Sequence, residues 1–157
     1  MSFGDAIGEC FFNYANFRDR AARAEYWWWA LFATILLLIG QGLDYVIFSD
    51  WETSPFYLVL SLATFLPSLS VTVRRLHDTN RSGWWVLLPF APMVLFFAGF
   101  IAALTMNPLN PFGPVGLILI GVPTILFIAA AILLLVWMVL PSDAGNNRFG
   151  PNRYAGD

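Results

Sequence analysis

Four stretches of this sequence are long and apolar enough to cross a lipid bilayer, and they limit the chain to a membrane fold. They cover about residues 26–48, 55–73, 84–104 and 115–140. A helix rises about 1.5 Å per residue, so roughly 20 apolar residues cross a hydrocarbon core about 30 Å thick. The sequence therefore predicts an all-α membrane protein with four transmembrane helices.

The composition agrees with this interpretation. Of the 157 residues, 59% are hydrophobic and only 11% are charged, whereas about a quarter of a soluble domain is charged. Such a chain would expose large apolar patches in water. Its length fits one compact unit, and we predict a single membrane domain over residues 1–157.

The positions of the basic residues predict how the chain is oriented. Every basic residue is an arginine, and four spans place all of them on one side of the membrane: Arg18, Arg20, Arg23, Arg74, Arg75, Arg81, Arg148 and Arg153. The loops on the opposite side contain no basic residue and carry Asp50 and Glu52. Because short cytoplasmic segments are enriched in Lys and Arg, we expect both termini and the 74–83 segment in the cytoplasm.

The first residues predict a short helix ahead of the spans. Apolar side chains recur there at helical spacing, at Phe3, Ile7, Phe11 and Tyr14, with acidic residues elsewhere on the wheel. The pattern is typical of an amphipathic helix lying in the membrane interface. A frayed terminus is the alternative.

The 74–83 segment, which we call the hinge, has the densest charge cluster of the chain. It contains Arg74, Arg75, His77, Asp78 and Arg81, and Trp84 and Trp85 follow it. Since short helices bring the segments of one membrane face together, we expect the hinge to meet residues from the other two cytoplasmic segments. Those residues are Arg18, Arg20, Arg23 and Glu25 of the lead segment and Arg148 of the tail. We call this predicted surface the arginine platform.

Two interpretations of the arginine platform stay open. In the first, Arg74, Arg75 and Arg81, with the amide groups that begin the third helix, bind the phosphate of an anionic lipid. In the second, the arginines only fix the orientation and Asp78 pairs with one of them. We expect membrane lipids as partners, with a protein partner or a second copy as further candidates, and no nucleic acid.

Nothing in the sequence indicates a reaction. His77 and Asp78 resemble a base and its orienting carboxylate, but adjacent residues on a helix do not face each other. Cys10 is the only cysteine, so it signals neither an intrachain disulfide nor a cysteine metal site. We expect a non-enzymatic binding or structural protein without catalytic residues, metal or cofactor.

The alternative function is a small oligomeric transporter or channel for a polar solute. It would need a hydrated path, and the spans contain few polar groups to line one: Thr34, Ser61, Thr64, Ser68, Ser70 and Thr124. Asp44, late in the first span, is either solvated near the outer headgroups or functional at membrane depth. Small residues suited to close helix contact are Gly99, Ala102, Ala103, Ala129, Ala130 and Ala131.

Three patches of the sequence resemble a known family. They are the arginine-rich lead into Glu25-Tyr26-Trp27, the stretch 74–85, and the tail 145–151. At these residues the chain resembles a family of small bacterial inner-membrane proteins catalogued as domain of unknown function 805, although Asp19 and Ala22 stand where members often have glycine and serine. The resemblance implies a four-helix protein of the bacterial inner membrane and supplies no activity.

Overall fold

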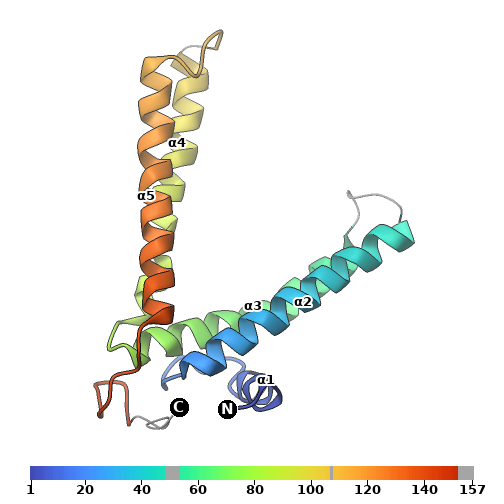
Figure 1. The fold of residues 1–157 in the computed structure, drawn as a ribbon. Helices are drawn as coiled ribbons and strands as arrows, with labels where there is room; N and C mark the ends of the chain where they lie inside the picture. The colour runs from blue at the N-terminus through green and yellow to red at the C-terminus, as the bar shows by residue number, and fades with distance from the viewer. Residues whose placement is uncertain (49–53, 107, 152–157) are drawn as a thin grey trace. The chain divides into compact units, whose positions relative to one another are not determined.

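The computed structural model describes residues 1–48, 54–106 and 108–151, which form α-helices joined by short connections (Figure 1). The elements are α1 (Phe3–Phe12), α2 (Arg23–Phe48), α3 (Pro55–Asp78), the 3₁₀ helix η1 (Gly83–Leu87), α4 (Phe90–Met106) and α5 (Pro114–Val139). Asp50, Glu52 and Arg153, which contribute to the topology prediction, lie outside the described residues.

Four helical segments have the length and hydropathy of membrane spans. They are α2, α3, η1 with α4, and α5, each of 24 to 26 residues. This confirms the predicted all-helical fold with four helical segments long and apolar enough to cross a membrane. α3 continues past the predicted end at residue 73 to Asp78, so Arg74 and Arg75 belong to its last turns.

The third span departs from the single helix predicted for 84–104. It begins with η1, and α4 starts only at Phe90. Pro89 lies between them; it has no N–H to donate and disfavours helical backbone at the residue before it. Gly83, the first residue of η1, approaches α3 closely, because a Cβ there would lie 2.6 Å from Cγ1 of Val73.

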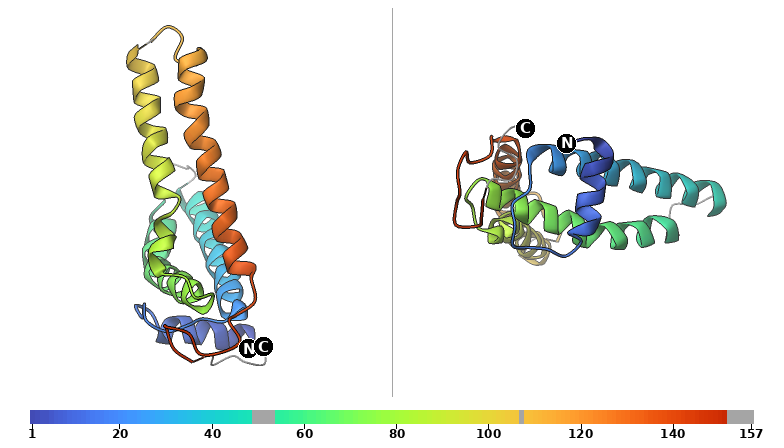
Figure 2. Two further views of the ribbon diagram at one scale, coloured as in Figure 1. Left: turned by 90° about the vertical axis from the view of Figure 1, so that its left-hand side faces the viewer. Right: turned by 90° about the horizontal axis from the view of Figure 1, so that it is seen from below.

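Two compact units make up the chain. Unit 1 consists of Met1–Gly83 with Leu140–Asp157, and unit 2 is Trp84–Val139. In unit 1, α2 and α3 pack side by side and α1 lies across them (Figure 2). Buried residues at their contact are Cys10, Ala21, Trp29, Ala33 and Val71. The indole Nε1 of Trp29 donates to Ser68 Oγ at 2.9 Å.

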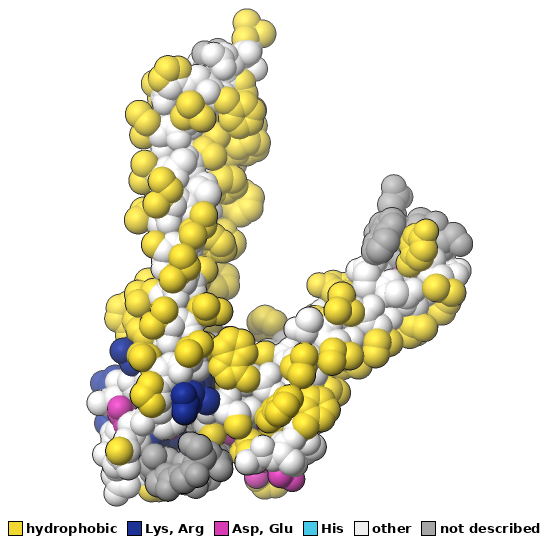
Figure 3. Space-filling view, viewed as in Figure 1, with side chains coloured by type: hydrophobic (Ala, Val, Ile, Leu, Met, Phe, Trp, Pro, Cys, Tyr) yellow, Lys and Arg dark blue, Asp and Glu magenta, His cyan; other side chains and the backbone are white. Residues whose placement is uncertain are grey.

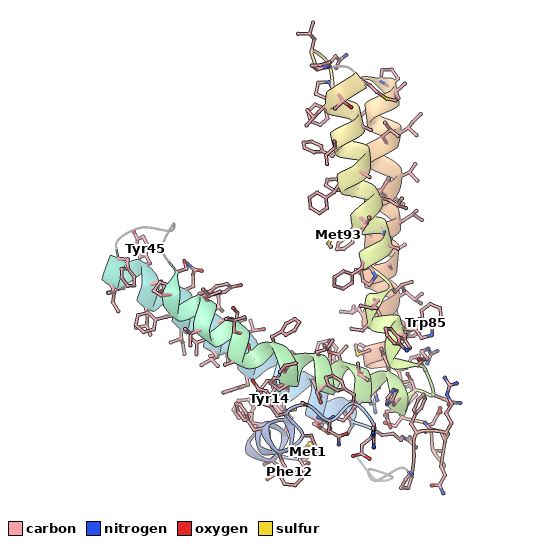
Figure 4. All side chains as sticks on the ribbon, turned by 180° about the vertical axis from the view of Figure 1, so that it is seen from behind. Met1, Phe12, Tyr14, Tyr45, Trp85 and Met93 are labelled. Atoms are coloured by element: carbon pink, nitrogen blue, oxygen red, sulfur yellow. The ribbon has the colours of Figure 1, made fainter. Side chains whose placement is uncertain are left out.

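The N-terminal segment is helical and docked. Ser2 and Asp5 form a capping box, which satisfies backbone N–H groups at the start of α1. Ala6 and Cys10 face the unit and are fully buried. Tyr14, just beyond α1, donates its hydroxyl to the carbonyl of Ala63 at 2.8 Å, whereas Phe12 points away and is 88% exposed (Figure 4).

Unit 2 is a pair of closely packed helices, α4 and α5. A Cβ at Gly99 would collide with the backbone carbonyl of Leu119, so only glycine permits this approach. Ala103 and Ala130 are also buried, as predicted for close helix contact. Ala102 is half-buried, and Ala129 and Ala131 are exposed, so they do not belong to that contact.

Candidate functional site

Five charged side chains are buried at the end of unit 1 where α2 begins and α3 ends. They are Arg20, Glu25, Arg74, Arg75 and Asp78, each at most 3% exposed. We call them the charge cluster. Figure 3 shows exposed charged side chains gathered towards this end of the unit, while hydrophobic side chains dominate the rest of its visible face.

The first ion pair of the charge cluster joins α2 to α3. Arg74 Nη1 donates to Glu25 Oε1 at 2.5 Å, with the two side chains 2% and 0% exposed. The same carboxylate oxygen accepts from the Cys10 thiol, whose Sγ lies 3.8 Å away. The pair therefore connects the first turn of α2, the last turns of α3 and the inner face of α1.

The second group of ion pairs is centred on Asp78. Arg20 approaches its Oδ1, with Nε and Nη2 each at 2.9 Å, and Arg75 donates to its Oδ2. Both arginines and the carboxylate are buried. Arg75 also donates to the carbonyl of Leu140. Burying such charges is tolerated because they are paired and hydrogen-bonded.

Arg20 fixes the C-terminal tail to this centre. Its guanidinium donates to the carbonyls of Asp143 at 2.7 Å, Gly145 at 2.8 Å and Gly150 at 3.3 Å. The N–H of Asp143 donates to the carbonyl of Asp78 at 3.1 Å. One side chain from the lead segment thus holds the end of α3 and the tail together.

His77 is held by the tail and the lead segment rather than by Asp78. Its ring stacks on Phe149 at a centroid distance of 3.9 Å, and Asn147 Nδ2 donates to its carbonyl at 2.9 Å. Its Nδ1 lies 3.2 Å from the carbonyl of Asp19, a contact in which Nδ1 must be the donor. The carboxylate of Asp78 pairs with arginines, so the geometry does not support a base with its orienter.

Cys10 lies in a site that disfavours its thiolate. Burial raises the pKa of the thiol to about 12, and the nearby charge of Glu25 acts in the same direction. A thiolate is the reactive form of cysteine. Cys10 is therefore a donor in the core of unit 1 and is poorly placed to act as a nucleophile.

The other four arginines that the structure describes are less buried and lie at different points of unit 1. Arg18, Arg23 and Arg148 are exposed, and Arg81 is half-buried. Arg148 lies over the Phe149 ring at 4.7 Å and donates to the carbonyl of Asn80 at 3.3 Å. Arg81 lines a hollow of about 550 Å³ together with Thr79, Asn80, Leu140, Pro141 and Asp143.

The structure thus brings together most of the predicted platform but divides it into two layers. Arg20, Glu25, Arg74, Arg75, His77 and Asp78 form or adjoin the buried interior. Arg81 and Arg148 lie at the surface, near the hinge backbone. Arg23 is exposed at the first residue of α2. Trp84 and Trp85 belong to unit 2 and are exposed, and Trp85 contacts Trp137 edge to face at 5.5 Å.

Asp44 has a structural role that neither sequence interpretation described. It is fully buried, and its two carboxylate oxygens accept from the backbone N–H groups of Phe56 at 3.0 Å and Tyr57 at 2.8 Å. These are among the N–H groups at a helix start that have no partner within the helix. Asp44 of α2 therefore caps α3 from a neighbouring helix, so it is not solvated.

Hydroxyl groups within the spans form hydrogen bonds to backbone carbonyls. Thr34, Ser61, Thr64 and Thr124 each donate to a carbonyl three or four residues earlier in their own helix. Ser70 donates to the carbonyls of Asn13 and Asn16. Side chains engaged in this way do not favour the transporter alternative. Among the described residues, no group of three or more His, Cys, Asp or Glu side chains is placed to hold a metal ion.

Comparison with known proteins identifies relatives that match between half and two thirds of this chain. The inner membrane protein YhaI of Escherichia coli K12 is 43% identical over 90 residues, covering 52% of this chain and 68% of the relative. The inner membrane protein YhaH of the same strain is 36% identical over 99 residues, covering 60% and 77%. No solved structure matches the chain. The family model for proteins of unknown function DUF805 matches residues 14–151, and the chain therefore belongs to this family.

Proposed function

We propose that this chain is a multi-pass protein of the bacterial inner membrane, with both termini in the cytoplasm. Its YhaI and YhaH relatives are named inner membrane proteins, and four apolar helices are present here. All arginines of the sequence then lie on the cytoplasmic side. Reporter fusions after Asp157 and within residues 107–111 test this orientation, and a cytoplasmic signal from the second fusion would contradict it.

The cytoplasmic surface of this protein, in our proposal, includes α1 as an interfacial helix. Phe3, Phe11 and Phe12 are exposed on α1, which also carries the acidic Asp5 and Glu9. Large apolar side chains at the surface of a docked helix are stabilised by contact with the acyl boundary of a bilayer. We expect a photolabel embedded in the membrane to label α1 less in the Phe12→Ser protein than in the wild type.

The proposed activity of this surface is binding of an anionic phospholipid headgroup. The observation that carries it is the hollow at Arg81, because its walls are the segments that directly follow α3 and α5. Both segments follow the ends of predicted spans, where lipid phosphates lie. The Arg81 guanidinium suits a phosphate, Leu140 and Pro141 suit the glycerol backbone, and Asp143 suits the hydroxyl groups of phosphatidylglycerol.

This proposal differs from the prediction that Arg74 and Arg75 bind the headgroup. Both side chains are buried and paired with carboxylates, so a lipid phosphate would have to displace those pairs. Our candidate is instead Arg81, which lines the hollow, with Arg148 and Arg23 adding attraction. Each juxtamembrane cation contributes about 1 kcal/mol towards an anionic leaflet.

Native mass spectrometry with phosphatidylglycerol and phosphatidylethanolamine in competition tests the headgroup site. The Arg81→Gln protein is expected to lose the phosphatidylglycerol preference, and Arg81→Lys to keep only part of it because lysine has no planar fork. Arg18→Gln is the matched control, since it removes one exposed charge outside the hollow. Equal losses in Arg18→Gln and Arg81→Gln would reduce the effect to nonspecific attraction and refute the site.

A further inference from the structure

One edge of a buried arginine in the charge cluster lacks a protein partner. Nε and Nη2 of Arg74 have no hydrogen-bond acceptor among the residues that the structure describes, although the side chain is only 2% exposed. Its Nη1 is the atom that pairs with Glu25. Nε and Nη2 lie on the edge of a guanidinium that binds oxyanions and halides with two parallel N–H groups. Two buried N–H donors without hydrogen-bond acceptors are energetically unfavourable.

The charge cluster as a whole carries an excess positive charge. Three arginines, Arg20, Arg74 and Arg75, face two carboxylates, Glu25 and Asp78, which leaves a formal charge of +1 in a buried region. Arg20 and Arg75 receive further compensation from the carbonyls of the tail. Arg74 is the member with two donors still available.

We propose that a small monovalent anion of halide size binds at the Nε–Nη2 edge of Arg74, within the charge cluster. Chloride is the physiological candidate. This site differs from the proposed headgroup site in place and ligand: it is buried among residues of α1, α2 and α3, whereas the headgroup site is the hollow at Arg81. The anion balances the excess charge and satisfies both donors.

The kind of anion follows from how deeply the Arg74 side chain is buried. Glu25 binds the opposite end of the guanidinium, and Cys10 donates to that carboxylate from α1. All three side chains are at most 2% exposed. An anion that enters this region must therefore lose its hydration, which favours weakly hydrated monovalent ions such as bromide over sulfate or phosphate.

Bromide is the probe for the first measurement, made on the full chain purified in a non-ionic detergent without phospholipid. Thermal unfolding is followed in sodium bromide and in sodium gluconate at equal ionic strength. We expect bromide to raise the unfolding midpoint in a saturable manner, whereas gluconate does not. Equal midpoints in the two salts over the whole range would overturn the proposal.

Substitutions locate the effect on Arg74. Arg74→Lys keeps a positive charge beside Glu25 but removes the Nε–Nη2 edge, so we expect its half-saturating bromide concentration to rise at least tenfold. Glu25→Gln raises the formal charge of the charge cluster to +2, so its half-saturating concentration should fall. Arg18→Gln, which changes an exposed arginine outside the charge cluster, should leave it unchanged. An unchanged bromide response in Arg74→Lys would refute the site.

A crystallographic measurement on the wild-type protein does not depend on any variant folding. Crystals soaked in bromide are expected to show an anomalous peak within hydrogen-bonding distance of Arg74 Nε and Nη2. Peaks found only at exposed arginines such as Arg18, or no peak at a saturating concentration, would contradict a buried anion site. The lipid experiment on Arg81 is independent of both results.

Discussion

The ion pair between Glu25 and Arg74 allows a quantitative test of the charge cluster. Glu25→Gln keeps the shape of the side chain and an acceptor oxygen but leaves Arg74 as a buried charge without its counterion. Arg74→Met does the reverse and leaves Glu25 unpaired. Breaking a buried pair on one side costs about 3–5 kcal/mol of unfolding free energy, and both side chains are at most 2% exposed here, so solvent screens neither.

The double variant Glu25→Gln/Arg74→Met removes both charges together. Replacing a whole buried pair with neutral side chains is often nearly neutral, because the desolvation of both ions disappears along with their attraction. We therefore expect the double variant to lose less unfolding free energy than either single variant. The interaction energy of the cycle should be at least about 2 kcal/mol, a size seen for residues in direct contact.

Equilibrium unfolding in mixed detergent micelles, followed by circular dichroism, measures the three free energies. Arg18→Gln is the control for loss of an exposed charge and should stay within about 0.5 kcal/mol of the wild type. If the two single costs simply add in the double variant, the side chains do not interact, and the reasoning from their 2.5 Å contact is wrong.

Three further predictions concern other parts of the chain. Asp44→Ala removes both acceptors at the start of α3 and should lower the unfolding free energy by about 2–4 kcal/mol, measured in the same micelles. Asp44→Asn should have an intermediate effect. Equal unfolding free energies for the wild type and both variants would contradict the cap. Gly99→Ala should destabilise the α4–α5 contact. Gly121→Ala, whose Cβ would enter open space, should be neutral or stabilising by up to about 1 kcal/mol. An unfolding temperature of Gly99→Ala equal to or above that of Gly121→Ala would refute the close approach. Cys10, whose pKa is raised to about 12, should resist maleimide between pH 7 and 9 in the folded protein and react once the chain is unfolded in SDS; fast labelling of the folded protein would show that the thiol is not buried.

Sequence reasoning identified the spans and the charged segments because both signals are local. Apolar runs long enough to cross a bilayer can be read directly from the sequence. Arg74 and Asp78 are recognised as easily because they are charged residues between two such runs. The partners of Arg20 could not be predicted in the same way. They include the backbone carbonyls of Asp143 and Gly145, and a carbonyl is present at every residue, so no residue type signals it.

Asp44 illustrates the same limit within a span. Its hydrophobic surroundings suggested a function at membrane depth or a position near the headgroups, whereas it caps α3 through the N–H groups of Phe56 and Tyr57. A signal was present, because a carboxylate in the last turns of one helix came shortly before Pro55, a residue that favours the first turn of the next. Predicting the cap needed the register between α2 and α3, which depends on their packing.

The two interpretations of the arginine platform apply to different arginines. Of the seven that the structure describes, Arg20, Arg74 and Arg75 are buried in ion pairs, and the other four are exposed or half-buried. All seven are charged while the chain inserts, so all contribute to the orientation predicted by the positive-inside rule. In the folded protein the buried arginines connect the lead segment, the end of α3 and the tail through ion pairs and hydrogen bonds. In our proposal, attraction for an anionic leaflet comes from Arg23, Arg81 and Arg148, at about 1 kcal/mol per juxtamembrane cation. Arg81 lines a hollow and is not part of the buried ion pairs of the charge cluster, so its substitution, rather than that of Arg74 or Arg75, separates headgroup binding from folding.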